Sequence, residues 1–220
     1  QRVVCQLVKK NIPVIASDVI LGDESKKLLN RIVNSGLDPN LLKIKELDIY
    51  NQNKIDQIIV QNGITHIICC GYQMSNMIDA DPILGSKINI VGMTNIFEST
   101  AKNKIQRLVF PSSESVYGTS QKIYGNRPVK EDDYCGLQHH QFTYAVMKLL
   151  NEFMAQKYVK AHGISIACTR PSVVFGYGRK RSSLMWAEDF ATLPALGKPV
   201  HLPFPEDNKD NWIYVDDCAD

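Results

Sequence analysis

Short apolar runs alternate with longer amphipathic stretches along most of the chain. The apolar runs have the length of buried strands, and the longer stretches repeat their apolar residues at the period of a helix. We predict strands at residues 14–17, 42–47, 66–70, 108–111 and 164–169, and helices at 2–10, 52–62, 86–103 and 143–162. Such alternation is typical of βα units, so the predicted fold class is α/β, a doubly wound parallel sheet with helices on both faces.

The predicted strands end in residues that suit ligand binding. In a doubly wound sheet, ligands bind outside the carboxyl ends of the strands. The residues predicted at these ends are Asp18, Asp48, Gly71, Ser113 and Pro171.

The pattern changes after Pro171, where prolines become frequent and little strand–helix alternation is visible. We therefore divide the chain into a cofactor domain, 1–171, and the start of a loop-rich substrate-binding region, 172–220. Both ends are expected to be truncated. Gln1 enters a helical pattern without a preceding strand, and Asp220 follows closely on the start of another helix. The alternative is a complete protein that starts at Gln1.

Composition narrows the function classes. The 220 residues carry a formal net charge of +2 and no basic stripe, so nucleic acid and membrane partners are not expected. No apolar run has the ~18 residues that a spanning helix needs. The six cysteines form no metal-binding pattern, and we predict no metal site. Cys69, Cys70 and Cys168 lie in apolar runs and are interpreted as buried, reduced thiols of a cytoplasmic protein.

Tyr144 and Lys148 are the first candidates for chemistry. A spacing of four places both side chains on one helix face. Hydride transfer at a hydroxyl-bearing carbon needs a proton donor and acceptor, and a nearby ammonium lowers the pKa of a tyrosine toward that role. The spacing alone is weak evidence, because Tyr50 and Lys54 repeat it in what we interpret as solvated surface.

Four ordered segments make the pattern specific. They are Pro111-Ser-Ser-Glu-Ser-Val-Tyr-Gly118, Tyr144-x-x-x-Lys148, Arg170-Pro-Ser-Val-Val-Phe-Gly-Tyr-Gly178 and Trp212-Ile-Tyr-Val-Asp-Asp217. In this order the chain resembles the extended short-chain dehydrogenases/reductases, the NAD-dependent epimerase/dehydratase family, over nearly its whole length. The resemblance implies a Rossmann-type domain and the cofactor NAD.

The resemblance also implies roles for individual residues. Ser113 takes the position of the catalytic serine or threonine that orients the substrate oxygen toward Tyr144. Asn89 matches the helix asparagine that supports the lysine through a water and the backbone. The residues expected to contact substrate are Ser113, Glu114, Ser115, Phe175 and Arg179.

The predicted cofactor face follows the strand ends. A carboxylate at Asp18 would bind the adenosine ribose and repel a 2′-phosphate, which favours NAD over NADP. The other residues expected to contact NAD are Asp48, Ile49, Gly71, Tyr72, Tyr144, Lys148, Pro171 and Val174. The chain departs from the family in four ways. The glycine-rich loop is absent, and Cys69-Cys70-Gly71-Tyr72 replaces the common His-Leu-Ala-Ala. Met147 stands where serine or threonine often precedes the lysine, and Val173 stands where many nucleotide-sugar enzymes carry asparagine.

The expected activity is reversible hydride transfer at a hydroxyl-bearing carbon of a sugar or sugar acid, either free or nucleotide-linked. Epimerase and sugar-acid dehydrogenase outcomes stay open, because both share the first half-reaction. A second hypothesis is a non-catalytic NAD-binding module that responds to redox state. A homodimer is expected through helices 86–103 and 143–162, which carry surplus apolar residues: Ile96, Phe97, Phe153, Met154 and Tyr158.

Overall fold

The computed structural model describes the chain except for residue 134 and residues 177–185, 203 and 206–208. The chain divides into two compact units. Among the described residues, unit 1 comprises residues 1–48, 173–176 and those of 186–220, and unit 2 comprises those of 49–172. In the part of the chain that is described, we find no helix with the length and apolar composition that a bilayer crossing requires.

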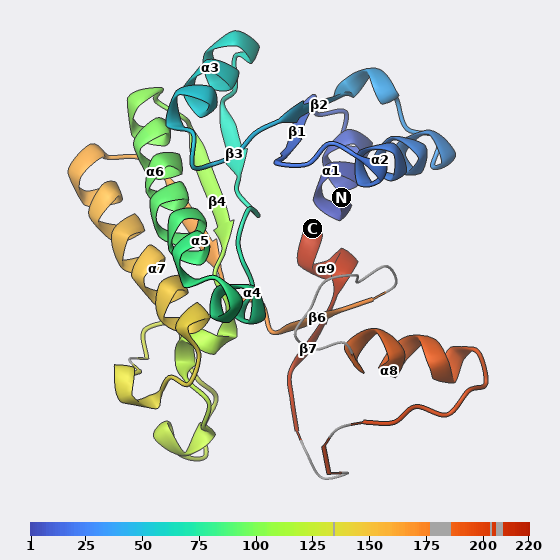
Figure 1. Ribbon diagram of the computed structural model, residues 1–220, viewed down its shortest axis with the longest axis vertical. Coiled ribbons are helices and arrows are strands. Elements are labelled where there is room, and N and C mark those ends of the chain that lie inside the picture. Colours follow the sequence, from blue (N-terminus) through green and yellow to red (C-terminus); the bar gives the residue numbers. More distant parts are fainter. Residues whose placement is uncertain (134, 177–185, 203, 206–208) are drawn as a thin grey trace. The chain divides into compact units, whose positions relative to one another are not determined.

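Unit 1 begins with a βα arrangement around a small parallel sheet (Figure 1). Its elements are α1 (Arg2–Lys9), β1 (Val14–Asp18), α2 (Asp23–Asn34) and β2 (Leu42–Glu46). β1 and β2 pair in parallel from Val14↔Leu42 to Asp18↔Glu46. The apolar faces of α1 and α2 pack on this pair and bury Val8, Leu28, Ile32 and Leu42.

The second part of unit 1 is also built from strands and helices. β6 (Val173–Phe175) pairs in parallel with β7 (Trp212–Tyr214), and the helices are α8 (Trp186–Ala195) and α9 (Val215–Ala219). Arg2 of α1 forms an ion pair of 3.1 Å with Asp216 of α9. The region that was expected to be rich in loops thus contains, among its described residues, two short strands of three residues each.

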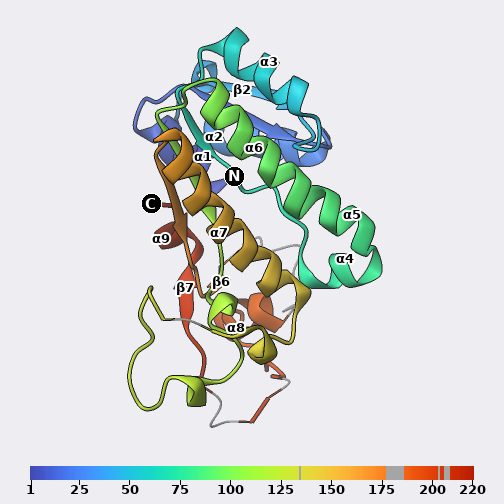
Figure 2. The same cartoon turned by 90° about the vertical axis from the view of Figure 1, so that its left-hand side faces the viewer.

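Unit 2 contains a three-stranded parallel sheet in the order β3-β4-β5. The strands are β3 (His66–Ile68), β4 (Arg107–Pro111) and β5 (Ile166–Thr169). Its helices are α3 (Gln52–Asn62), α4 (Ser75–Ala80), α5 (Pro82–Ser86), the π-helical turn η2 (Lys87–Gly92), α6 (Met93–Lys102) and α7 (Thr143–His162). Figures 1 and 2 show α6 and α7 side by side along one face of the sheet.

Short 3₁₀ turns follow β4 in unit 2. They are η3 (Glu114–Tyr117), η4 (Gln121–Ile123) and η5 (Leu137–His139). Two of the longer helices have clear end signals. The Asn51 side chain caps α3 by accepting a hydrogen bond from the Lys54 amide, and glycines in the left-handed region end α3 and α7 at Gly63 and Gly163.

The structure confirms an α/β fold with parallel strands. The described strands pair in three separate sheets, β1-β2, β3-β4-β5 and β6-β7, and not in one continuous sheet. Cys69 is buried as predicted, but Cys70 and Cys168 are exposed. The prediction was wrong for Cys70, which follows β3, and for Cys168, which lies in β5 at the edge of its sheet.

Two residues expected at a subunit interface lie in the core. Ile96 and Phe97 are 3% and 0% exposed, and the Phe97 ring contacts that of Phe110 in β4 at 5.7 Å between centroids. The apolar residues of α6 cover the sheet of unit 2 and are not available to a partner. Phe153 of α7, in contrast, is 54% exposed.

Candidate active site

Tyr144 and Lys148 lie in the first part of α7 in unit 2. The Lys148 side chain is buried, and its Nζ donates a hydrogen bond of 2.6 Å to the carbonyl oxygen of Pro111 at the end of β4. Burial lowers the pKa of Lys148 to about 8, although electrostatic interactions with Cys69, Cys70 and Glu152 act to raise it. The ammonium is thus held at the strand end where the sequence predicted chemistry.

Tyr144 is half-buried beside Ser113. Burial raises the pKa of Tyr144, and a hydrogen bond with the Ser113 side chain lowers it in part. The Ser113 hydroxyl also accepts hydrogen bonds from the amide and hydroxyl of Ser115, at 3.2 and 2.9 Å, and so caps η3. The structure therefore brings together the predicted Ser113, Tyr144 and Lys148, with Glu114 and Ser115 in the adjoining turn.

Asn89 is completely buried in the π-helical turn η2. Its side-chain amide binds the backbone of Gln73 twice. Oδ1 accepts from the Gln73 amide at 2.7 Å, and Nδ2 donates to the Gln73 carbonyl at 3.1 Å. Asn89 therefore fixes the segment that follows β3, and its side-chain amide also donates to Met147 Sδ of α7 at 3.6 Å. A wide π turn that presents a polar side chain inward is common at functional sites.

Tyr72 lies between the elements that carry the other site residues. Its ring centroid is 3.5 Å from Lys148 Nζ, and its ring meets that of Tyr144 edge to face at 5.6 Å. The Tyr72 hydroxyl accepts a hydrogen bond of 3.1 Å from Asn151 Nδ2. The same nitrogen donates to the carbonyl oxygen of Asn89 at 2.9 Å.

Sequence reasoning missed Asn151. The signal was available, because Asn151 stands three residues after Lys148 and lies on the same face of α7. It is completely buried, which an asparagine tolerates only when it is hydrogen-bonded. Its place beside the tyrosine–lysine pair marks it as a structural partner of the site.

Arg170 and Glu152 form a buried ion pair behind the site. Arg170 Nε and Nη2 donate to the two carboxylate oxygens of Glu152 at 3.0 and 2.6 Å. Arg170 Nη1 also donates to the Tyr117 hydroxyl and the Glu131 carbonyl, each at 2.7 Å. The hydrogen bonds to Glu152 raise the pKa of Arg170, although burial acts to lower it. This pair connects α7, η3 and the segment after β5, and the sequence had pointed to Arg170 only as part of a motif.

Three predicted cofactor residues besides the tyrosines and lysine also belong to unit 2. Ile49 packs against two glycines. A Cβ at Gly92 would lie 2.7 Å from Ile49 Cγ1, and one at Gly71 would lie 3.5 Å from Ile49 Cδ1. Pro171 follows β5, and its carbonyl oxygen accepts from the Glu114 amide at 3.1 Å. Ile49, Gly71 and Pro171 are therefore held by close packing or by a backbone hydrogen bond.

The remaining predicted residues are described in unit 1. Asp18 ends β1 and is exposed, as is Asp48, which follows β2. Val174 and Phe175 lie in β6, where the Phe175 ring contacts Trp212 and Tyr214. These four residues belong to unit 1, and Tyr144 and Lys148 belong to unit 2. Arg179 lies outside the described residues.

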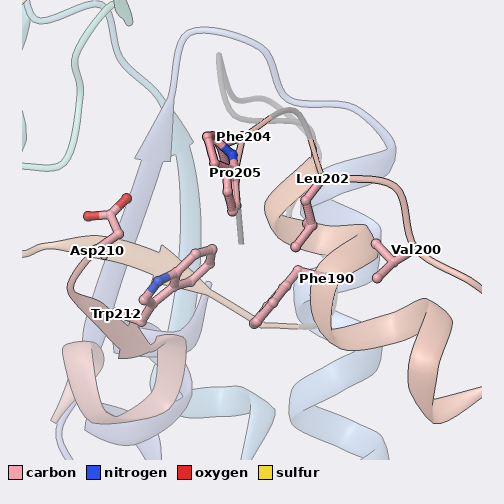
Figure 3. A pocket seen from close by; sticks show the side chains of 7 residues that line it. All are labelled: Phe190, Val200, Leu202, Phe204, Pro205, Asp210 and Trp212. Atoms are coloured by element: carbon pink, nitrogen blue, oxygen red, sulfur yellow. The ribbon is translucent and has the colours of Figure 1, made fainter. Parts of the chain in front are cut away.

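Unit 1 also carries a pocket of about 430 Å³ (Figure 3). Figure 3 shows apolar and aromatic side chains around it, with Asp210 at one side. The lining residues are Phe190, Val200, Leu202, Phe204, Pro205, Asp210 and Trp212. The Trp186 ring packs against the rings of Phe204 and Trp212, with 4.7 and 5.0 Å between ring centroids, and so supports the pocket. Within the described residues, no group of three or more His, Cys, Asp or Glu is placed to hold a metal ion.

Comparison with known proteins identifies the family of this chain. Residues 3–220 match the model of the NAD dependent epimerase/dehydratase family. An uncharacterized protein of Methanocaldococcus jannaschii is 33% identical over 180 residues, which are 81% of this chain and 48% of that protein. The chain thus spans about half the length of this relative.

Two solved structures show a similar fold. The GalE-like L-threonine dehydrogenase of Cupriavidus necator superposes with a TM-score of 0.78 at 19% identity, over 99% of this chain and 65% of that one. The UDP-glucose 4-epimerase of Thermus thermophilus, in complex with NAD, gives a TM-score of 0.72 at 20% identity, over 99% and 68%. The fold is thus that of the Rossmann-type short-chain dehydrogenases. By its motifs, fold and family match, the chain belongs to the NAD-dependent epimerase/dehydratase family.

Proposed function

We propose that this protein is an NAD-dependent enzyme that transfers hydride reversibly at a hydroxyl-bearing carbon of a sugar or sugar acid. The observation that carries the proposal is the arrangement of Ser113, Tyr144 and Lys148. A tyrosine hydroxyl hydrogen-bonded to a serine lies one helical turn from a buried ammonium. A structural role alone does not account for a buried lysine, because burying its charge costs free energy.

Each side chain has a defined task in this proposal. The Tyr144 hydroxyl takes the proton from the substrate hydroxyl during oxidation and returns it during reduction. The Ser113 hydroxyl binds the substrate oxygen and orients it toward Tyr144. The positive charge of Lys148 stabilises the tyrosinate and so lowers its proton affinity, against the burial that raises the pKa of Tyr144.

NAD fits the residues around Lys148. An ammonium has three donors, and the oxygen that Lys148 binds among the described residues is the carbonyl of Pro111. The remaining donors suit the hydroxyl groups of a ribose. The bound cofactor would supply the hydride acceptor and donor. Asp18, exposed at the end of β1, would select NAD by repelling the 2′-phosphate of NADP.

The substrate proposal rests on a residue of unit 1. Val173 donates its amide to the carbonyl oxygen of Asn211 at 3.2 Å, and its side chain has no hydrogen-bond donor. This feature favours a small sugar or sugar acid over a nucleotide sugar. L-Threonine is a second candidate, because an L-threonine dehydrogenase has a similar fold.

Two outcomes remain alternatives within the proposal. In an epimerase the hydride returns to the opposite face of the same carbon, whereas in a dehydrogenase the reduced cofactor is released. A non-catalytic NAD-binding module is the competing class. The retention of Ser113, Tyr144, Lys148 and Asn89 in one place argues against that class, because a module that only binds NAD has no need of an acid–base pair.

A substrate screen with a matched variant tests the proposal. The purified protein is incubated with NAD and a panel of free aldonic and uronic acids, UDP-glucose, UDP-galactose and L-threonine. Absorbance of reduced cofactor reports dehydrogenation, and NMR reports epimerisation. Tyr144→Phe should bind NAD normally and lower kcat by roughly 10²–10⁴, the usual effect of losing a general acid or base.

The outcomes separate the alternatives. Near-normal turnover in Tyr144→Phe would exclude Tyr144 as the acid–base group. Efficient epimerisation of a UDP-sugar without activity on free acids would refute the argument from Val173. Tight NAD binding without turnover of any compound in the panel would favour the non-catalytic module.

A further inference from the structure

The Lys148 ammonium has an aromatic neighbour that is closer than Tyr144. The Tyr72 ring centroid lies 3.5 Å from Lys148 Nζ, whereas the Tyr144 ring centroid lies 5.5 Å away. A cation over an aromatic face at this distance is attracted by the ring quadrupole, and most strongly when both are removed from water. Lys148 is 3% exposed, so this contact is largely desolvated.

Tyr72 is held in place from three directions. Its hydroxyl accepts from Asn151 on α7, and its ring edge meets Tyr144 at an interplanar angle of 89°. The next residue, Gln73, is fixed by the paired hydrogen bonds from Asn89. Asn151 joins these contacts, since it also donates to the Asn89 carbonyl. The ring therefore cannot leave the ammonium without breaking several buried interactions.

The Tyr72 hydroxyl is not a second acid–base group. Burial, with the neighbouring Tyr144, raises the pKa of Tyr72 far above its ordinary value, so the phenol stays neutral. Its hydroxyl contacts Asn151, which is completely buried, and not the serine that contacts Tyr144. Tyr72 can therefore act on the reaction only through its neighbours.

We propose that Tyr72 is a positioning residue, whose ring face holds the Lys148 ammonium beside Tyr144 and keeps it charged. The inference rests on the proposed function, since it concerns the same site. The other groups that face Lys148 are the Pro111 carbonyl of β4, the thiols of Cys69 and Cys70 after β3, and Tyr144 and Glu152 of α7. Tyr72 supplies the aromatic face among them.

Two variants distinguish the effect of the aromatic ring face on Lys148 from the effect of burial under any apolar side chain. Tyr72→Leu keeps an apolar side chain over the ammonium but removes the quadrupole. Tyr72→Phe keeps the ring and removes only the hydrogen bond from Asn151. NMR of lysine side-chain nitrogens follows the titration of Lys148 directly, and the resonance that is absent in Lys148→Met identifies it.

We expect Tyr72→Leu to lower the titration midpoint of Lys148 by on the order of one pH unit, because the ammonium loses its cation–π partner while its burial remains. Tyr72→Phe should leave the midpoint close to that of the wild type. The pH profile of kcat should follow, with the loss of rate at high pH beginning earlier in Tyr72→Leu than in Tyr72→Phe. The KM for substrate should change less than kcat.

Equal midpoints in the wild type, Tyr72→Leu and Tyr72→Phe would overturn the proposal. If Tyr72→Leu does not fold, a fluorinated phenylalanine at position 72 keeps the shape of the ring and weakens its quadrupole, and the same shift is expected. The titration needs no substrate. A protein that turns over no compound would therefore refute the proposed function, while the Lys148 midpoint would still decide the role of Tyr72.

Discussion

The ion pair Arg170–Glu152 offers the clearest test of how unit 2 is held together. Glu152 has a side chain that is 5% exposed, and both of its carboxylate oxygens accept from the Arg170 guanidinium. We choose Glu152→Gln because it preserves the shape and removes the charge. Arg170 then loses its counter-charge while it stays largely buried, at 20% side-chain exposure.

The expected loss follows from burial. Breaking a buried ion pair by removing one partner costs about 3–5 kcal/mol. Arg170 keeps its hydrogen bonds to Tyr117 and Glu131 and is partly exposed, which places the loss near the lower limit, about 3 kcal/mol. At roughly 2–4 °C per kcal/mol for a chain of this size, the Tm should fall by roughly 6–12 °C.

A second ion pair in the same unit provides the matched control. Arg127 and Asp133 also form two hydrogen bonds, each of 2.7 Å, but the Arg127 side chain is 46% exposed. Asp133→Asn should therefore destabilise the protein by clearly less than Glu152→Gln, because solvent screens the exposed pair. The free energy of unfolding is measured by urea denaturation, followed by far-ultraviolet circular dichroism. Equal losses in both variants, or a loss below about 1 kcal/mol in Glu152→Gln, would show that burial does not determine the strength of this pair.

Three further predictions concern charge, cofactor and assembly. Because the pKa of Lys148 is lowered to about 8 by burial, the unfolded chain binds more protons than the folded one between that pH and the ordinary lysine value. The free energy of unfolding of the wild type should therefore rise relative to Lys148→Met over this window, by up to about 3 kcal/mol, and denaturation at a series of pH values checks it. Asp18→Asn should reduce the preference for NAD over NADP about tenfold, measured as the ratio of the two Kd values. An unchanged ratio would show that Asp18 does not contact the ribose. Phe153, exposed on α7, should lie in a dimer interface, so Phe153→Glu should sediment as a monomer where the wild type is a dimer; a monomeric wild type at micromolar concentration contradicts this.

Local signals explain which elements could be predicted from the sequence. The predicted bounds 52–62 and 143–162 agree with α3 and α7, because Gly63 and Gly163 end these helices with a conformation that other residues avoid. α2 was missed because its twelve residues are mostly charged or polar, and its helical period has few apolar positions to show. The π turn at Lys87–Gly92 was included in a regular helix, since one extra residue in a turn leaves no mark in composition.

Some features of the candidate site could likewise be predicted from the sequence, and others could not. Tyr144 and Lys148 could be recognised because both lie on one helix, where four residues fix their relation. The partners of Asn89 could not, because Gln73 and Asn151 are 16 and 62 residues away along the chain and only folding brings them together. The role of Tyr72 was hidden for a similar reason: its ring contacts a lysine on another element.

The Asn89–Gln73 hydrogen bonds have a consequence for local motion. The Gln73 amide belongs to a connection between β3 and α4, and backbone amides in loops commonly exchange their protons with solvent more readily than those of core helices. Its proton instead points at the side-chain oxygen of a fully buried asparagine, which Asn151 fixes to the middle of the longest helix. Exchange at Gln73 therefore requires the loop after β3 to separate from η2. This loop amide should exchange more slowly than its neighbours in the same connection, and would report the opening of the site at this loop.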